Sequence, residues 1–506
     1  MFRQNKGPNA GTASQGQVVP VPADLSEAML QMGNRLGSSD DIVVRPLHYG
    51  DGERFAAALI YIDGMTDMKI LDLSVLQPLL NAHPEQPYDM ETFAARYVAV
   101  SSAVLVQDMN VLVRDVLGGN AVLLGQGCRQ ALSIGARHWA QRALDEPSTE
   151  TVVRGPHQGF TETLRTNTVL LRRILQNPQL RIDMLKIGAN TSTDVAVVYL
   201  DNIVLPGLVE EVKTRLGTIK SDKVVESGVL QVEISDAPRS IFDTMNSSER
   251  PDTIALQLLN GRVAIIVDGS PFVLSAPCLF LESFRNPEDF YIKPHFAATL
   301  FILRLISYVL TILAPAIYVA LTTFHQELIP TSLLFTMTSG RQNTPFPSSI
   351  EAVLMIAMFD ILKEAGVRLP KPIGPAISIV GALVLGQSAV EAGLVGPFMV
   401  IVVATTAIAG FAIPSQLSSS AILRYIFLAT ATLMGGFGIV MAGIVLALHL
   451  VSLESFGVPF LTPLSPTKPK WLLGFSLLWH QKPSDDTQVA QMQAMRTGQD
   501  ETEGTP

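Results

Sequence analysis

The sequence predicts an α/β soluble N-terminal region of two subdomains, followed by an α-helical polytopic membrane domain of about four spans plus a short re-entrant or interfacial helix. Two observations lead to this fold class. The chain has 506 residues, more than one domain of ordinary size contains. Its mean hydropathy of +0.33 and hydrophobic content of 48% are high for a soluble protein, and charges become sparse from 296 to 455. A charged soluble part therefore precedes an apolar membrane part.

The soluble region contains two pairs of similar segments. Residues 55–62 read as a buried strand followed by a turn and a helix, and 194–216 repeat this order of strand and helix. Residues 109–134 and 251–276 both read as helix, glycine turn, strand, glycine turn, strand. The simplest organisation is two α/β subdomains that meet near Pro147 and are related by duplication. Chance similarity of common α/β patterns is the alternative.

Composition divides the chain into five regions. In chain order we expect a disordered N-terminal tail, two soluble subdomains, a transmembrane domain, and a C-terminal tail that is largely disordered after residue 480. Their bounds are 1–38, 39–146, 147–292, 293–455 and 456–506. The N-terminal residues are rich in Gly, Gln, Ser and Pro and include no apolar core of a secretory signal. We therefore expect the soluble region on the cytoplasmic side.

Four apolar runs are about as long as the lipid core is thick. They are 297–324, 373–390, 395–413 and 425–448. Basic residues before the first run and after the last place both ends in the cytoplasm, which requires an even number of spans, although four basic residues between the runs oppose this rule. The apolar stretch of the segment 347–370 is too short and too charged to span comfortably, so the segment reads as a re-entrant or interfacial helix.

Composition and motifs argue against several function classes. The net charge of −9 and the absence of a basic run argue against a nucleic-acid partner. The soluble region has no phosphate-binding loop, dinucleotide fingerprint, zinc-protease motif or nucleophile elbow, so the sequence predicts neither an enzyme nor a cofactor. Eight scattered histidines predict no metal site, and two cysteines, Cys128 and Cys278, cannot form a disulfide framework.

Polar residues inside the apolar part are the candidate functional residues. A carboxylate in a membrane segment faces a bundle interior, a partner charge or water. Gln387 and Glu391 lie at i and i+4 on one helix face, with an interfacial position of Glu391 as the alternative. The residues that we predict to contribute to a pore or gate are Arg304, Asp360, Glu364, Arg368, Gln387 and Glu391.

Small residues recur every four positions in the second apolar run. They are Gly374, Ser378, Ala382 and Gly386. Such a stripe lets another helix approach closely, either within one bundle or between subunits around a path. We expect these four residues to be helix-packing residues.

Several long motifs together resemble the GerA family of spore germination proteins. The first stretch contains "ERPDTIALQLLNGRVAIIVDGSPFVL" and "NPEDFY", and other matching stretches are "RGPHQGFTETLRTN" and "PSSIEAVLMIAMFDILKEAGVRLPKPIGPAISIVGALVLGQSAVEAG". The resemblance covers about residues 45 to 465. Within the family, the sequence is more similar to the receptor A subunit than to the sporulation-stage paralogue.

The resemblance implies a component of the nutrient germinant receptor in the inner membrane of the spore, with its N-terminal region on the core side. In that family the A subunit works with a transporter-like B subunit, to which the nutrient pocket is attributed, and a lipoprotein C subunit. The A subunit is thought to oligomerise into a ligand-gated channel. The implied partners are therefore the B and C subunits, further copies of this chain, the lipid bilayer and monovalent cations.

Two other functions compete with the channel. A secondary transporter would use an intramembrane charge to bind a substrate or proton, but four spans are few and no inverted repeat with paired broken helices is visible. A membrane-anchored scaffold would dock partners through its soluble region and have no pore. The sequence names neither the nutrient nor the oligomer number.

Overall fold

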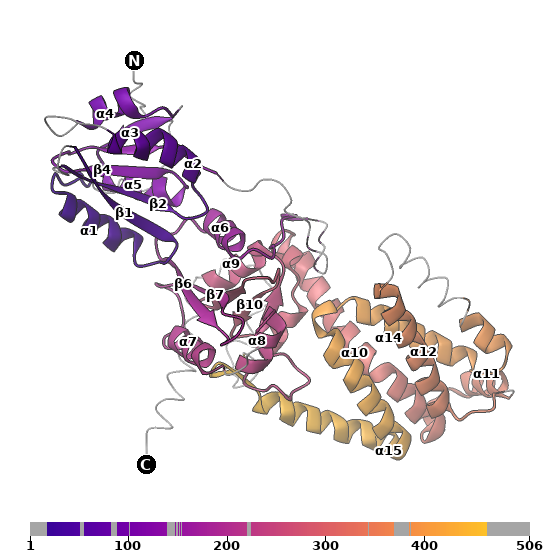
Figure 1. Cartoon of the computed structure of the whole chain (residues 1–506). Coiled ribbons are helices and arrows are strands. Elements are labelled where there is room, and N and C mark those ends of the chain that lie inside the picture. Colours follow the sequence, from indigo (N-terminus) through magenta and orange to yellow (C-terminus); the bar gives the residue numbers. More distant parts are fainter. Residues whose placement is uncertain are drawn as a thin grey trace, which may run out of the picture. The chain divides into compact units, whose positions relative to one another are not determined.

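The computed structural model describes residues 18–50, 55–81, 89–100, 102–138, 147, 150, 152, 154–219, 224–342, 344–368, 384 and 386–462. The chain divides into two compact units, whose elements are drawn in Figure 1. Unit 1 contains the chain up to Ser275 except for 152–155 and 235–246. Those two segments and the rest of the chain form unit 2.

The first sheet of unit 1 has five strands in the order β1-β2-β4-β5-β3, with antiparallel neighbours throughout. The strands are β1 (Ile42–Tyr49), β2 (Phe55–Ile62), β3 (Ala103–Val106), β4 (Ala121–Gly125) and β5 (Ala131–Ile134). The surrounding helices are α1 (Leu25–Leu36), α2 (Met68–Leu71), the π-helix η1 (Asp72–Leu76), α3 (Gln77–Leu80), α4 (Met90–Tyr97) and α5 (Met109–Leu117).

Helices cover both faces of this sheet, because side chains alternate between the faces of a strand. In β2, Ile60 and Ile62 pack in one core with residues of α1 and α5. The intervening Leu59 and Tyr61 pack in a second core with residues of α2, η1, α3 and α4. The sheet is therefore the middle of three layers, which explains why β2 reads as a continuous apolar run.

The second sheet of unit 1 repeats the strand order of the first: β6-β7-β9-β10-β8. Its strands are β6 (Leu180–Ile187), β7 (Thr193–Leu200), β8 (Asn246–Ser248), β9 (Val263–Val267) and β10 (Val273–Ala276). Its helices are α6 (Leu164–Ile174), α7 (Leu208–Thr218), α8 (Ser227–Ile234) and α9 (Pro251–Leu259). The helix, strand, strand pattern predicted at both 109–134 and 251–276 is confirmed, since α5-β4-β5 and α9-β9-β10 hold equivalent places in the two sheets.

The prediction of a disordered tail over residues 1–38 is wrong for residues 25–36. The side chain of Asp24 accepts a hydrogen bond from the backbone N–H of Glu27 and caps α1. Leu25, Ala28 and Met32 of this helix are buried, at the three- and four-residue spacing of one helix face. This short amphipathic pattern was not recognised as a helix because the residues before it are rich in Gly and Ser.

Residues 39–41 connect the first sheet to the second. Ser39 Oγ accepts the backbone N–H of Ile182 at 2.9 Å, and the N–H of Asp40 donates to the carbonyl of Ile182 at 3.0 Å. Arg172 of α6 is fully buried and donates to both carboxylate oxygens of Asp41 at 2.8 Å each, and to Ser39 Oγ at 2.9 Å. These bonds cover the edge strand β6, which would otherwise present unpaired backbone groups.

Unit 2 is built around the helix α10 (Pro294–Thr323), which packs against α12, α14 and α15. The other helices are α11 (Thr331–Arg341), α12 (Ser348–Arg368), α14 (Pro397–Phe411) and α15 (Leu417–Ser452). Short elements complete the unit: η2 (Phe280–Phe284), η3 (Pro287–Phe290), η4 (Gln326–Leu328), η5 (Pro414–Gln416), β11 (Glu454–Ser455) and β12 (Val458–Pro459). The segment expected to be a re-entrant or interfacial helix is α12, of 21 residues.

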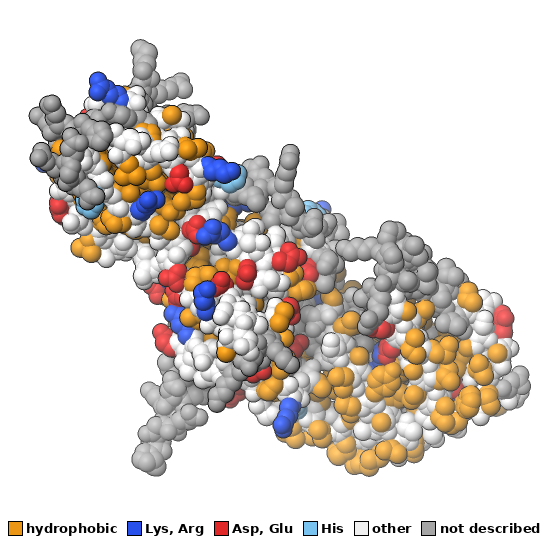
Figure 2. All heavy atoms as spheres, viewed as in Figure 1, with side chains coloured by type: hydrophobic (Ala, Val, Ile, Leu, Met, Phe, Trp, Pro, Cys, Tyr) orange, Lys and Arg blue, Asp and Glu red, His pale blue; other side chains and the backbone are white. Residues whose placement is uncertain are grey.

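Among the described residues, two helical segments are long and apolar enough to cross a membrane, Pro294–Thr323 and Pro414–Ser452. The helix α14 is apolar but shorter. Figure 2 shows many hydrophobic side chains and few charged ones on the displayed face of unit 2. Such an apolar exterior suits a lipid solvent and agrees with a membrane domain.

The last expected span, 425–448, is not one straight helix, because α15 turns at Gly435 (φ 60°, ψ −139°). Figure 1 shows its two limbs converging on this turn. Ser415, just before α15, donates to the carbonyl of Ser283, whereas the N–H of Gly436 donates to Nε2 of His325 at 3.3 Å. His449 returns to within 3.1 Å of Ser240. The run thus forms a helical hairpin, and hydropathy could not detect a turn made of glycine within an apolar sequence.

These contacts define two ends of unit 2. We call the end formed by 235–246 and 276–290 the base, and the end where α10 stops, next to Gly435, the far end. The residues just past the expected boundary at 455 belong to the fold of the base, since Phe456 and Phe460 are fully buried. Phe460 packs against Phe242 and Phe280 with ring centroids 6.2 and 5.9 Å away.

Candidate functional site in the membrane domain

In the described part of unit 2, three arginine–carboxylate pairs join its elements at different levels. The pairs are Arg304–Asp289, Asp360–Arg424 and Arg341–Glu351. An unpaired charge is costly in a lipid-facing bundle, so each pair fixes two elements relative to each other.

Arg304 of α10 is buried near the base. Its Nη1 and Nη2 donate to the two carboxylate oxygens of Asp289 at 2.5 and 3.0 Å, and Nη1 also donates to the carbonyl of Phe284 at 3.2 Å. This two-pronged geometry is the strong form of an arginine–carboxylate pair. The structure therefore places the predicted residue Arg304 in a bond that attaches α10 to η3.

Asp360 of α12 faces the first limb of α15. Arg424 Nη2 donates to both carboxylate oxygens at 2.8 Å each, and the hydroxyl of Tyr425 donates to Oδ2, also at 2.8 Å. Arg424 is 7% exposed. Lys363, one turn further along α12, lies 5.4 Å above the ring of Phe411 of α14. Asp360 is thus the centre of a polar contact between α12 and α15.

Gln387 and Glu391 do lie on one helix face, as the sequence predicted. The side-chain amide of Gln387 donates to Oε1 of Glu391 at 2.8 Å, and both side chains are exposed on the single chain. The nearby Gly386 is buried, and a Cβ built there would lie 3.4 Å from Val400 of α14. Gly386 therefore faces α14, and its packing role stays a prediction.

Among the other predicted residues, Glu364 is the one whose side chain the structure describes. Glu364 is exposed on α12, and Arg368 ends that helix with its side chain outside the described part of the structure. The stripe residues Gly374, Ser378 and Ala382 also lie outside the described residues.

The sequence analysis missed the pair Arg341–Glu351. Glu351 of α12 has a completely buried side chain; Arg341 Nη2 donates to its Oε1 at 3.4 Å, and the N–H of Gly396 donates to its Oε2 at 3.2 Å. Neither residue carries a local signal, because Glu351 reads as an ordinary acidic residue in the first turn of a helix. Arg424 was detectable, as an arginine inside an apolar run.

Unit 1 holds a further buried polar cluster at the "ERPD" motif. Arg250 is fully buried; its Nη2 donates to Asp252 Oδ2 at 2.8 Å and to the carbonyl of Pro156 at 3.0 Å. Ser248 Oγ donates to Glu150 Oε2 at 2.6 Å. Burial raises the pKa of the Glu150 carboxyl, and the Ser248 hydroxyl and the charge of Arg250 offset this only in part. The motif therefore joins the start of α9 to Glu150 and Pro156.

Comparison with known proteins decides the family. Residues 30–482 match the family model described as "Bacillus/Clostridium GerA spore germination protein". The chain belongs to the GerA family. Spore germination protein KA of Bacillus subtilis (strain 168) is a GerA relative, 39% identical over 96% of this chain and 90% of its own length. Spore germination protein GerLA of Bacillus cereus is 36% identical over 89% of this chain and 92% of its own.

Two other comparisons concern this GerA chain. An uncharacterized membrane protein, YfkQ of Bacillus subtilis (strain 168), is 39% identical over 89% of this chain and 88% of its own. The crystal structure of the N-terminal domain of the A subunit of the Bacillus megaterium spore germinant receptor GerK3 is 30% identical. It covers 52% of this chain and 99% of its own, with a TM-score of 0.41. Membership of the GerA family supports a role in spore germination.

Proposed function

We propose that this chain is the A subunit of a spore nutrient germinant receptor and signals nutrient binding by opening an oligomeric, ligand-gated cation channel. The receptor role is supported by relatives named as spore germination proteins that align over about nine-tenths of both chains. The channel is supported by the polar residues of unit 2, described above.

The observation that carries the channel proposal is the exposed pair Gln387–Glu391. An ionised carboxylate facing lipid costs roughly 2.5–3.5 kcal/mol at the membrane centre on insertion scales, and less near an interface. The pair is exposed on a single chain, next to a glycine that contacts α14. In an oligomer this face would line a wet path between subunits, where carboxylates raise the local concentration of cations.

The assembly and location follow from the same proposal. The chain would function as a homo-oligomer with a transporter-like B subunit and a lipoprotein C subunit, in the inner membrane of the spore. Its N-terminal region would lie on the cytoplasmic, core side. Both ends of α15 lie at the base of unit 2. Its two limbs therefore either cross the membrane twice or do not cross it. It thus leaves the two flanking segments on the same side of the membrane.

Flux measurements on the assembled receptor test the proposal. The receptor is reconstituted in vesicles loaded with K⁺, and efflux is recorded after nutrient is added. We expect Glu391→Ala and Gln387→Ala to change the efflux while leaving assembly intact. Thr405→Ala is the control, because Thr405 is an exposed polar residue on another helix, α14. Wild-type efflux from both variants would remove these residues from the path.

Two outcomes would favour the other functions. If the oligomeric receptor binds nutrient but passes no ions, the chain is a scaffold without a pore. If vesicles containing this chain alone accumulate a substrate against its gradient, the chain is a secondary transporter.

A further inference from the structure

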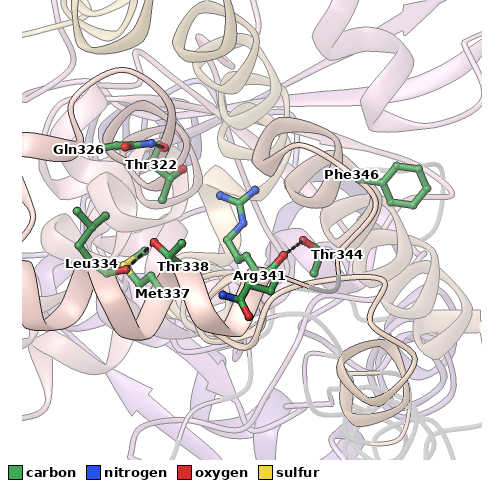
Figure 3. Close-up of a pocket in the computed structure, with 9 residues that line it drawn as sticks. Thr322, Gln326, Leu334, Met337, Thr338, Arg341, Thr344 and Phe346 are labelled. Carbon is green, nitrogen blue, oxygen red and sulfur yellow. Dashed lines mark hydrogen bonds between the residues drawn. The ribbon is translucent and has the colours of Figure 1, made fainter.

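A polar pocket opens at the far end of unit 2, between the C-terminal end of α10 and α11. Its volume is about 310 Å³, which is the size of a small-molecule site. Its wall combines a guanidinium, two side-chain amides and three hydroxyls with three apolar side chains. The lining residues are Thr322, Gln326, Leu334, Met337, Thr338, Arg341, Gln342, Thr344 and Phe346. Figure 3 shows the guanidinium of Arg341 projecting from α11 among these residues.

Arg341 has more hydrogen-bond donors than the protein uses. Its side chain is 23% exposed and makes one side-chain bond, the 3.4 Å contact with Glu351, among the described residues. Its Nε is buried without a hydrogen-bond partner in the described part of the chain. A guanidinium carries five N–H donors, and a carboxylate accepts two of them in parallel at about 2.8 Å. The observed pair is therefore far from the strongest bond that Arg341 can form.

A second polar group without a partner among the described residues lies on α10, one turn before Thr322 of the pocket wall. Tyr318 of α10 is 7% exposed, and its hydroxyl has no hydrogen-bond partner among the described residues. It lies within electrostatic range of both Arg341 and Glu351. A buried hydroxyl without a partner costs free energy, so this donor is available to an acceptor that loses its present partner.

We propose that this pocket binds a small organic carboxylate, which accepts hydrogen bonds from Arg341 in place of Glu351. The ligand carboxylate forms the two-pronged bond that Glu351 does not form. The aliphatic part of the ligand lies against Leu334, Met337 and Phe346. Glu351 remains buried after the exchange and accepts its replacement hydrogen bond from the hydroxyl of Tyr318.

The exchange would be transmitted to the rest of the bundle through Glu351. That carboxylate also accepts the backbone N–H of Gly396, directly before α14, and it lies on the same helix as Asp360, the partner of Arg424. A ligand that takes Arg341 therefore loosens the junction of α11, α12 and α14. The pocket is then a regulatory site, and its existence does not depend on whether the assembled protein conducts ions.

Binding to the purified full-length chain in lipid nanodiscs tests this inference directly. The probe is sodium butyrate, and the controls are 1-butanol, which has the same chain without the carboxylate, and sodium chloride. Isothermal titration should show saturable binding of butyrate and none of 1-butanol. We expect the double variant R341M/E351M, which removes both charges and leaves neither unpaired, to fold and to bind butyrate at least about tenfold more weakly.

Two further variants separate the site from the fold. Thr338→Val alters the pocket wall without touching Glu351 and should weaken butyrate binding, whereas Arg239→Met, at an exposed arginine of the base, should not. Tyr318→Phe should weaken binding while leaving the empty protein as stable as wild type, because the lost hydroxyl has no partner in the described part of the chain. Absence of saturable binding at about 10 mM butyrate, or equal affinity in R341M/E351M, would overturn the proposal.

Discussion

Arg424 donates to both carboxylate oxygens of Asp360 at 2.8 Å each, and so ties the first limb of α15 to α12. Because Arg424 is 7% exposed, Asp360→Asn leaves a nearly buried guanidinium without its counter-charge. We expect the free energy of unfolding to fall by about 2–3 kcal/mol, at or below the low end of the range for buried pairs, since Asp360 is 34% exposed. Thermal unfolding in detergent measures this change. Asp360→Leu with Arg424→Leu should be milder than the single change, and equal losses would show that the pair does not hold the helices together.

Gly435→Ala should disrupt the hairpin of α15. A Cβ at Gly435 would lie 2.8 Å from Cβ and Cγ of Phe324, and the φ of +60° is unfavourable for any residue with a side chain. We expect a loss of at least about 1–2 kcal/mol, measured as thermal stability of the full-length protein in detergent. Gly443→Ala is the matched control, because nothing lies within 4 Å of its Cβ position on the second limb. That variant should be neutral or slightly stabilising, since alanine favours helix.

Arg172→Met should loosen the two halves of unit 1. The change removes three hydrogen bonds and leaves the partly buried Asp41 without its cation, at a cost of about 3–5 kcal/mol. Hydrogen exchange should show faster exchange in residues 39–41 and in β6. Lys186→Met provides the contrast, because Lys186 is 74% exposed and pairs with Asp194 at 3.5 Å, so its loss should cost less than about 1 kcal/mol. Similar exchange in the two variants would contradict a connecting role for Arg172.

The stability of unit 1 should fall as the pH rises through the pKa of Glu150. Burial raises the pKa of this carboxyl above its ordinary value, so in the pH range between the two values the folded state binds a proton that the unfolded state has released. Its contribution to stability is therefore full below the unfolded pKa and is lost above the folded pKa. Denaturant unfolding of wild type and Glu150→Gln across this range measures the effect. The variant should have the flatter profile, and parallel profiles would assign the pH dependence to other groups.

The alternating and glycine-punctuated segments made the two sheets predictable. The strand predicted at 55–62 and the helix, strand, strand units at 109–134 and 251–276 are all present, because hydrophobic runs and glycine turns are local signals. The two sheets have the same strand order because the two segments have the same order of helices and strands. The helix α1 was not predicted, because the residues before it have the composition of a disordered tail. Asp24 and the spacing of Leu25, Ala28 and Met32 do indicate this helix locally.

The membrane domain was less predictable, for two physical reasons. An apolar run reads the same whether it crosses once or turns at Gly435, since hydropathy does not record a backbone angle. Asp360 and its partner Arg424 are 64 residues apart in the sequence, so no local pattern joins them. The local pair Gln387–Glu391 was found because its two members are neighbours on one helix.

The two carboxylates of α12 constrain how that helix can move. Glu351 and Asp360 are nine residues apart, which places them about 180° from each other around the helix axis and about 13 Å apart along it. Their bonds therefore hold opposite sides of α12, one to α11 and the start of α14 and the other to α15. Rotation of α12 in either direction lengthens both sets of bonds at once. We therefore expect α12 to rotate only when the bonds on both of its sides break together.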